Sequence, residues 1–416
     1  MLNTRPLRAA LEACEHQRRV EVEDMDNDPW TLVLPNGDLD LRAIQDWEPP
    51  HDATEAEIAR SKLSWLRETD RSKLPTKCGG VDFDPTARAP AWDRLVELVI
   101  PDPDIRACAQ RCLGATLFGQ NKAQVAIIMR GPGGNGKSTL LNGLSHVLGT
   151  RDGYAAPCKI EMFLETGNAQ ASSATPEEAD LPGARAYIAT EPGAQDILSA
   201  KKIKGMTGGD RRMSRGLYAD PFFWTPRGVP ILSCNRTPKI KDEDEGTRRR
   251  LVFLPFDVNL RSLPPELQRD QGEVEAELRS QGSGILNWLI EGYQDFMRRG
   301  IDMPEPMSRL KEQLLEAADP VGVFLTEMTV KKTSGRLSVS EFYKTHEAWC
   351  EQEGRTQYQM KKVGDIMVEK GFERGPINGR SHWKGLRWSD AACDLVEQAT
   401  GHRPSYASRP KDAPPF

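Results

Sequence analysis

The sequence predicts an α/β fold: a central parallel sheet, an α+β and helical region before it, and a small C-terminal domain after it. Three observations support this prediction. Short apolar runs alternate with helical segments between residues 125 and 258, as in a sheet whose strands are buried on both faces. A glycine-rich segment at 131–138 joins one of these runs to a helix. Residues 321–390 have the pattern of two helices followed by a hairpin.

Composition narrows the functional classes. A chain of 416 residues corresponds to about two to three domains. The net charge of −5 excludes a uniformly basic nucleic-acid binder, so any such site must be a local patch. The cysteines are scattered, which favours a reducing, cytoplasmic setting, and we expect Cys108 and Cys112 to be buried helix residues rather than zinc ligands. No long apolar run or signal peptide is recognisable.

The N-terminal elements are expected in residues 1–120. A helix is predicted at 7–16, and two short strands at 30–42 are separated by Asn36-Gly37, a hairpin turn signal. Helical patterns follow at 91–100 and 105–119. Asp104 is the expected N-cap of the second of these helices.

The core is expected in residues 121–260. Strands are predicted at 125–129, 184–191, 229–235 and 250–256, with a helix from Ser138. Because proline is awkward in a central strand, the third strand is expected to start after Pro230. A helical extension should occupy 261–320, ending at a boundary near Pro320.

The C-terminal elements are expected in residues 321–390. One helix opens with Ser338 and Glu341 in capping-box spacing, a second covers 360–372, and a hairpin turns at Asn378-Gly379. This order is typical of a winged-helix module, which would bind DNA or, alternatively, protein. Residues 391–416 are Pro-rich near their end and are predicted to be a disordered tail.

The segment 131–138 fits the P-loop pattern G-x-x-x-x-G-K-[ST] and has the required strand before it and helix after it. Its backbone amides would surround nucleotide phosphates, Lys137 would reach the β- and γ-phosphates, and Ser138 would bind Mg²⁺. The cofactors expected from this motif are ATP and Mg²⁺. The expected nucleotide-binding residues are Gly131, Pro132, Gly133, Gly134, Asn135, Gly136, Lys137, Ser138 and Thr139.

Polar residues that end or precede the other strands are candidates for the reaction itself. Glu191 ends an apolar strand, where it would polarise the attacking water and help to hold Mg²⁺. Asn235 ends the next strand and would sense the γ-phosphate. Arg249 and Arg250 precede the last strand and would stabilise charge on a neighbour's nucleotide, the alternative being a solvated basic turn.

A basic block lies between the strands that end in Glu191 and Asn235. Six lysines and arginines fall between residues 201 and 215 against one acid, Asp210. The turn sequence Gly208-Gly209-Asp210 is expected to place Arg211 and Arg212 at a hairpin tip, with Lys204 nearer its base. The alternative is a solvated helix face and loop. The predicted DNA contacts are Lys204, Arg211, Arg212 and Arg215.

These motifs in this order resemble superfamily 3 helicases, and more closely the phage, plasmid and poxvirus-type primase–helicases. Two motifs carry the resemblance most specifically: Lys204-x-x-Thr207-Gly208-Gly209-Asp210, and the Arg249–Phe256 segment. The resemblance implies an AAA+-like ATPase core with an N-terminal collar and a C-terminal winged-helix-like domain. It also implies a ring, usually hexameric, around single-stranded DNA, with Arg249 or Arg250 acting on the neighbouring subunit.

The sequence departs from this family at its N-terminus. Only about 120 residues precede the P-loop, too few for a primase and a collar, so we expect a helicase without a primase domain. Its expected partners are single-stranded or forked DNA, further copies of the chain, and a separate primase or other replication proteins, in a bacterial or phage-infected cytoplasm. The alternatives are a replication initiator or loader that does not unwind processively, and an ATPase of a defence or packaging system.

Overall fold

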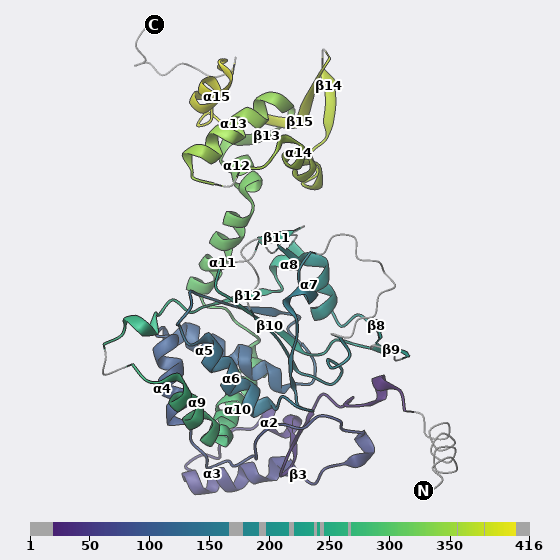
Figure 1. Ribbon diagram of the computed structural model, residues 1–416, viewed down its shortest axis with the longest axis vertical. Coiled ribbons are helices and arrows are strands. Elements are labelled where there is room, and N and C mark those ends of the chain that lie inside the picture. Colours follow the sequence, from purple (N-terminus) through teal and green to yellow (C-terminus); the bar gives the residue numbers. More distant parts are fainter. Residues whose placement is uncertain are drawn as a thin grey trace, which may run out of the picture. The chain divides into compact units, whose positions relative to one another are not determined.

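The structure, a computed structural model of the chain, describes residues 20–165, 178–190, 197–215, 220–236, 239–241, 245–264, 268–355, 357–377 and 379–404. The chain divides into two compact units, Met1–Lys311 and Glu312–Phe416 (Figure 1). The regions expected at 1–120 and 121–260, and residues 261–311 of the third expected region, belong to one unit. The division falls before Pro320, inside helix α11 (Glu305–Ala318). No described helix has the length and apolarity needed to cross a bilayer.

A five-stranded parallel sheet forms the centre of the first unit, in the order β12-β4-β10-β6-β5. Most of its residues are buried, which explains the apolar runs in the sequence. The carboxyl ends of β4, β10 and β6 are adjacent at one edge. The five strands are β4 (Ala126–Arg130), β5 (Ala155–Pro157), β6 (Ala186–Thr190), β10 (Val229–Cys234) and β12 (Leu251–Pro255).

Strand β10 includes Pro230, so the prediction that it begins after this proline is wrong. The amide of Val229 donates to the carbonyl of Arg185 on the β6 side, and pairing with β4 begins only at Ile231. Successive residues of a strand direct their N–H groups to opposite sides. The missing N–H of Pro230 therefore faces the side on which β4 does not yet pair, and no ladder hydrogen bond is lost.

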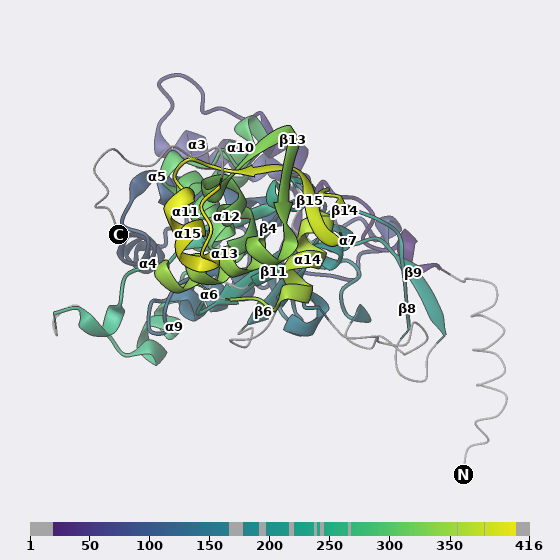
Figure 2. The same ribbon diagram turned by 90° about the horizontal axis from the view of Figure 1, so that it is seen from above.

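Helices pack on one another beside this sheet (Figures 1 and 2). One apolar core extends from Leu32 in the N-terminal hairpin through the sheet to Met307, so the N-terminal region and the sheet are a single folded body. The packed helices are α4 (Pro90–Val99), α5 (Pro103–Gly114), α6 (Lys137–Leu148), α9 (Gln271–Ser280) and α10 (Gly282–Arg299).

The N-terminal region contains the expected hairpin, β1 (Thr31–Leu34) and β2 (Gly37–Asp40), extended by β3 (Leu66–Arg67) and followed by α2 (Leu41–Gln45) and α3 (Glu55–Lys62). The cap of α5 is Asp102 rather than Asp104, because Pro103 takes the first helical position. Cys108 and Cys112 are buried in α5, as predicted. The helix expected at 7–16 lies outside the described residues.

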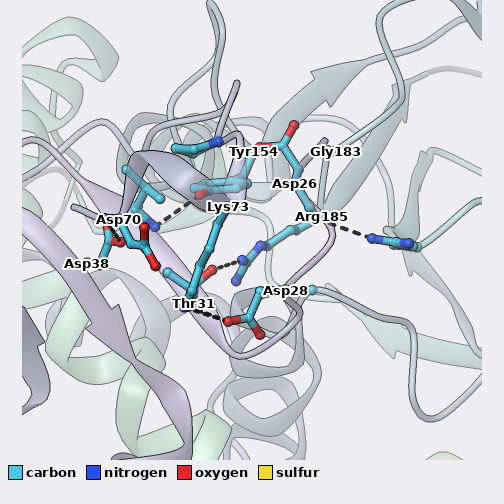
Figure 3. A pocket seen from close by; sticks show the side chains of 13 residues that line it. Asp26, Asp28, Thr31, Asp38, Asp70, Lys73, Tyr154, Gly183 and Arg185 are labelled. Atoms are coloured by element: carbon cyan, nitrogen blue, oxygen red, sulfur yellow. Dashed lines mark hydrogen bonds and ion pairs between the residues drawn. The ribbon is translucent and has the colours of Figure 1, made fainter. Parts of the chain in front are cut away.

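A buried arginine bonds this hairpin to the sheet (Figure 3). Arg185, which directly precedes β6, is only 4% exposed and donates hydrogen bonds to the carbonyls of Thr31 and Leu117. Its guanidinium carbon lies 4.5 Å from the centre of the Tyr154 ring. The Tyr154 hydroxyl in turn accepts a 3.0 Å hydrogen bond from the Val33 amide. These contacts satisfy a buried cation with carbonyls and a ring, as burial requires.

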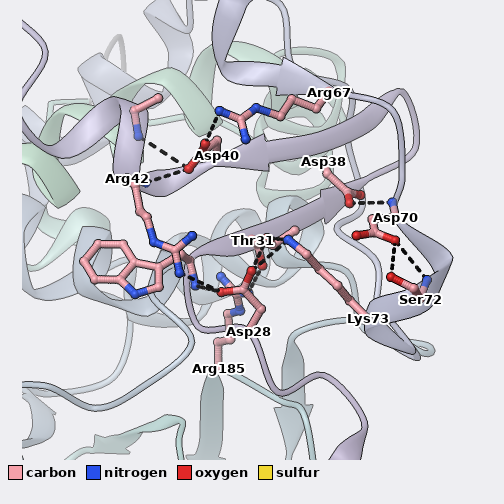
Figure 4. Close-up of polar contacts among 12 residues, drawn as sticks. Asp28, Thr31, Asp38, Asp40, Arg42, Arg67, Asp70, Ser72, Lys73 and Arg185 are labelled. Atoms are coloured by element: carbon pink, nitrogen blue, oxygen red, sulfur yellow. Dashed lines mark hydrogen bonds and ion pairs between the residues drawn. The ribbon is translucent and has the colours of Figure 1, made fainter.

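The carboxylate of Asp28 lies next to this polar cluster (Figure 4). Asp28 accepts hydrogen bonds from the Thr31 hydroxyl and, at 2.8 Å, from the Lys73 ammonium. Burial alone would raise the pKa of Asp28, but the hydrogen bonds from Lys73, the Trp30 amide and Thr31 lower it to about 2. The carboxylate is therefore ionised at neutral pH and fixes the start of β1.

The second unit contains a three-stranded antiparallel sheet in the order β13-β15-β14. Ser338 accepts a hydrogen bond from the Glu341 amide at the predicted start of α13. The core of the second unit is largely aromatic and includes Phe324, Phe342, Trp349 and Trp388. The elements, in chain order, are α12 (Pro320–Met328), β13 (Thr329–Ser338), α13 (Val339–Gln352), α14 (Met360–Glu369), β14 (Arg374–Ile377), β15 (Arg380–Trp388) and α15 (Cys393–Thr400).

Helix α15 corrects the prediction that a disordered tail begins at residue 391. Leu395 and Val396 are buried in the core of the second unit, so the apolar spacing of this segment outweighs the Pro-rich composition that follows it. Residues 405–416 lie outside the described part of the chain.

Candidate active site

The P-loop connects β4 to α6 at the carboxyl edge of the sheet, as predicted. The Gly131 amide donates to the carbonyl of Cys234 in β10, and the Asn135 side chain donates a 2.7 Å hydrogen bond to the carbonyl of Phe256. A Cβ atom on Gly131 would lie 2.0 Å from that same carbonyl, so only glycine fits there. Two neighbouring strands thus hold the loop in shape.

Gly136 directly precedes α6 and has a φ of +82°, in the region that favours glycine. A Cβ atom there would also lie 2.5 Å from Cγ1 of Val99 in α4. The N-terminal region therefore packs directly against the loop. The amides at the start of α6 form the kind of helix N-terminus that binds phosphate oxygens.

Lys137 is folded over the loop and is 4% exposed. Its ammonium donates to the carbonyls of Gly131 and Pro132 and, at 3.0 Å, to Oδ1 of Asn135. It also lies 3.4 Å from Oδ1 of Asn235, the residue that directly follows β10. The structure thus brings together two of the residues that the sequence singled out, although 98 positions separate them.

Ser138 and Thr139, the last two residues of the predicted nucleotide-binding set, lie at the start of α6. Ser138 is exposed in the first turn of α6, and Thr139 behind it is buried. Glu191 lies outside the described residues, but Thr190 before it pairs with Ser233, next to Asn235's strand end. Among the described residues no group of three or more His, Cys, Asp or Glu side chains could hold a metal. The hydroxyl of Ser138 suits a Mg²⁺ ion that takes its other ligands from phosphates and water.

A cavity of about 680 Å³ opens beside the P-loop. Its size and its mainly apolar walls are typical of a site for a small organic ligand. Sequence reasoning missed these walls, because the amphipathic pattern of α4 does not show which partner the helix packs against. The lining residues are Ala91, Arg94, Leu95, Glu97 and Leu98 of α4; Gly134, Gly136 and Thr139; and Leu260, Arg261, Leu263, Gln268, Arg269, Gln271 and Val274.

Arg249 and Arg250 lie at the amino end of β12, after the short helix α8 (Glu245–Arg248). The P-loop follows the carboxyl end of the neighbouring strand β4, so neither arginine is beside its own P-loop. Arg249 is exposed, whereas the half-buried Arg250 donates to the carbonyl of Gly246 and to Gln124 Oε1. Arg249 is therefore the better placed of the two to reach another molecule.

The basic block forms α7 (Ala200–Thr207) and the first strand of a hairpin, β8 (Arg212–Arg215) with β9 (Pro221–Trp224). The prediction that Arg211 and Arg212 occupy the hairpin tip is wrong. Gly208 caps α7 and Gly209 has a φ of +76°, so this glycine pair ends a helix rather than turning a hairpin. The connection between the strands is residues 216–220, beside Arg215.

Two of the predicted DNA contacts are held by carboxylates. Arg211 binds Glu23 in a bidentate pair, at 2.7 and 2.8 Å, and its hydrogen bonds lower the pKa of Glu23. Arg212 binds Glu178, which is 8% exposed. Lys204 is half-buried in α7, and Arg215 is exposed at the end of β8. Figures 1 and 2 show this hairpin projecting from the body of the first unit.

The sequence is similar to one described protein family and to viral proteins. The family described as "D5 N terminal like" matches residues 2–101. "Putative helicase L207/L206" of Acanthamoeba polyphaga mimivirus is 29% identical over 269 residues, which is 61% of this chain and 28% of the relative. Residues 2–101 thus resemble a domain of the D5-like primase–helicases, and the chain is similar over part of its length to viral proteins named putative helicases. This similarity agrees with the helicase motifs of the sequence.

A second relative and one solved structure extend the comparison. "Putative helicase 022R" of Frog virus 3 (isolate Goorha) is 32% identical over 164 residues, 38% of this chain and 16% of the relative. The chain thus spans less than a third of the length of these relatives. An apo structure of the C-terminal region of NrS-1 is similar at 12% identity, with a TM-score of 0.47, over 79% of this chain and 89% of that one.

Proposed function

We propose that the chain is an ATP-dependent DNA helicase of the replication type. The observation that carries the proposal is the meeting of Lys137 and Asn235 at the P-loop, beside a cavity large enough for a nucleoside. An ammonium and an amide that converge on one point of a phosphate-binding loop suit recognition of a γ-phosphate. Relatives that are named putative helicases support the same function.

In this proposal Lys137 leaves the loop carbonyls and binds the β- and γ-phosphates, and Asn235 orients the attacking water or the γ-phosphate. Glu191 accepts a proton from that water. Mg²⁺, held by Ser138 and the phosphates, would neutralise phosphate charge when it is bound. Arg249 of a neighbouring copy stabilises the transferred charge, which makes a ring oligomer, of six copies in the family's usual form, the active assembly.

The exposed positive charges of the α7 and β8 region would contact single-stranded DNA in this assembly. Because they belong to a segment between β6 and β10, a change at the nucleotide can move them. The helix, strand, helix, helix and hairpin order of the second unit supports a winged-helix-like role in contacting DNA or protein.

The test is ATP hydrolysis and strand displacement on forked DNA by the purified chain. Lys137→Ala should abolish hydrolysis, because a phosphate-neutralising cation is lost. Glu191→Gln should bind ATP with the parent's affinity and not turn it over, because an amide cannot accept the proton. A parent that hydrolyses ATP and binds DNA without displacing a strand would favour the initiator or loader alternative. Normal hydrolysis by the Glu191→Gln protein would exclude the assigned role of Glu191.

A further inference from the structure

Three arginines line the cavity beside the P-loop, and they differ in their partners. Arg94 and Arg269 both bind Glu277, at 3.0 and 2.7 Å. Arg261 makes no ion pair with any residue that the structure describes. One carboxylate therefore offsets the charge of two of these arginines, whereas no described carboxylate offsets the charge of Arg261.

The backbone around Arg261 is fixed against the P-loop. The Leu260 amide donates a 2.9 Å hydrogen bond to the carbonyl of Gly134. Asn259 accepts a 3.0 Å hydrogen bond from the Arg261 amide and caps the short turn Leu260–Ser262. A Cβ atom placed on Gly134 would lie 3.3 Å from Nε of Arg261, so the guanidinium lies over this loop residue.

The position of Arg261 relative to Lys137 indicates which part of a nucleotide it can reach. Lys137 contacts Gly131, Pro132 and Asn235, whereas the cavity is lined by Gly134, Gly136 and Thr139. Loop amides bind the α- and β-phosphates and the lysine reaches the β- and γ-phosphates. Arg261 is therefore on the side of the loop away from the bond that is cleaved, between the phosphates and the apolar walls that suit a base.

We propose that Arg261 is a nucleotide-binding residue that acts within its own subunit and contacts the α- and β-phosphates. This inference rests on the proposed ATPase function and assigns one further residue to that site. A contact to phosphates that ATP and ADP share stabilises both nucleotides and the transition state equally. Its loss should therefore weaken binding and leave the chemical step unchanged.

The experiment is titration of the full-length parent and an Arg261→Ala variant with ADP by calorimetry, together with kcat and KM for ATP. Loss of one charge-assisted hydrogen bond predicts that the Kd for ADP and the KM for ATP both rise by about tenfold or more, with kcat within about twofold of the parent's. Arg261→Lys should recover part of the affinity, because it keeps the charge but not the fork of donors.

The control is Arg279→Ala on α9, which removes the same charge from an exposed pair with Glu275 outside the cavity. It should bind ADP like the parent. Unchanged ADP affinity in Arg261→Ala, or a loss of kcat without a change in Kd, would overturn the inference while leaving the proposed function intact. Failure of the parent itself to bind either nucleotide would instead overturn the proposed function.

Discussion

The buried histidine His346 should make the stability of the second unit depend on pH. His346 in α13 is 0% exposed, and its ring centre lies 5.1 Å from that of Phe324. Its ring contacts Sγ of Cys350 at 3.5 Å, in a core made otherwise of apolar groups. Burial lowers the pKa of His346 from 6.5 to about 4, so the imidazole is neutral in the folded protein at neutral pH.

Acidification should therefore destabilise the second unit. The neutral ring's contribution is complete above the unfolded pKa of 6.5 and is lost as the pH falls from there to about 4, because the unfolded chain takes up a proton that the folded one resists. The loss approaches about 3 kcal/mol at pH 4. This loss of stability can be measured by hydrogen exchange of α13 peptides in the full chain at pH 7 and pH 5, after correction for intrinsic exchange rates.

A His346→Leu variant should lose most of this pH dependence, since leucine does not titrate. His402→Gln is the control, because His402 is exposed. If the exchange of α13 in the leucine variant depends on pH as strongly as in the parent, another group carries the effect.

At the scale of elements, the β8–β9 hairpin is held to the body of the unit by a buried chain of hydrogen bonds. The Trp224 indole donates a 2.7 Å hydrogen bond to the Ser214 hydroxyl, which donates to Glu178. Arg212 binds the same carboxylate. Arg212 is thus a structural cation, and its removal would leave a buried carboxylate short of a partner. Arg211, whose partner Glu23 is one-third exposed, is the better probe of DNA contact.

Replacing Arg211 should weaken binding of single-stranded DNA. We expect Arg211→Ala to reduce the steepness of log affinity against log salt by about 0.7, the value for one lost phosphate contact on a single strand. Glu23→Gln should bind DNA at least as tightly as the parent, since it frees Arg211. Fluorescence anisotropy of a labelled oligonucleotide over a range of salt concentrations measures both. An Arg211→Ala protein with the parent's slope would move the contact to Lys204 or Arg215.

At the scale of the whole molecule, the proposed active form is an assembly whose sites are completed by a second copy. Arg249→Ala and Lys137→Ala proteins should each be inactive alone. Mixed in equal amounts, they should recover up to about a quarter of the parent's ATPase rate, because random assembly leaves that share of interfaces with both groups intact. The rate is read in a coupled assay, and co-assembly is checked by light scattering. Co-assembled mixtures without activity would place the arginine's role elsewhere.

Most of the correct predictions of the fold and of the P-loop rest on local sequence patterns. The P-loop was predictable because its glycines and flanking elements are contiguous, and the buried strands because apolar runs mark them. What the sequence could not show are pairings over long separations. Glu23 lies 188 positions from Arg211, and no local rule connects them. The glycine pair at 208–209 suits both a hairpin turn and a helix end, and only the packing of α7 decides between these.

The packing of Trp92 on the P-loop helix has a consequence for how such a protein can evolve. A Cβ atom on Gly143 of α6 would lie 2.7 Å from Cζ3 of Trp92, so the Trp92 ring fits only against a glycine at position 143. Trp92 lies inside the segment that matches the family model, which ends at residue 101, and Gly143 lies beyond it. Recombination at that boundary would split one core into two apolar halves and remove a wall of the cavity. We therefore expect the two segments to be inherited together, with compensating changes at the positions of Trp92 and Gly143.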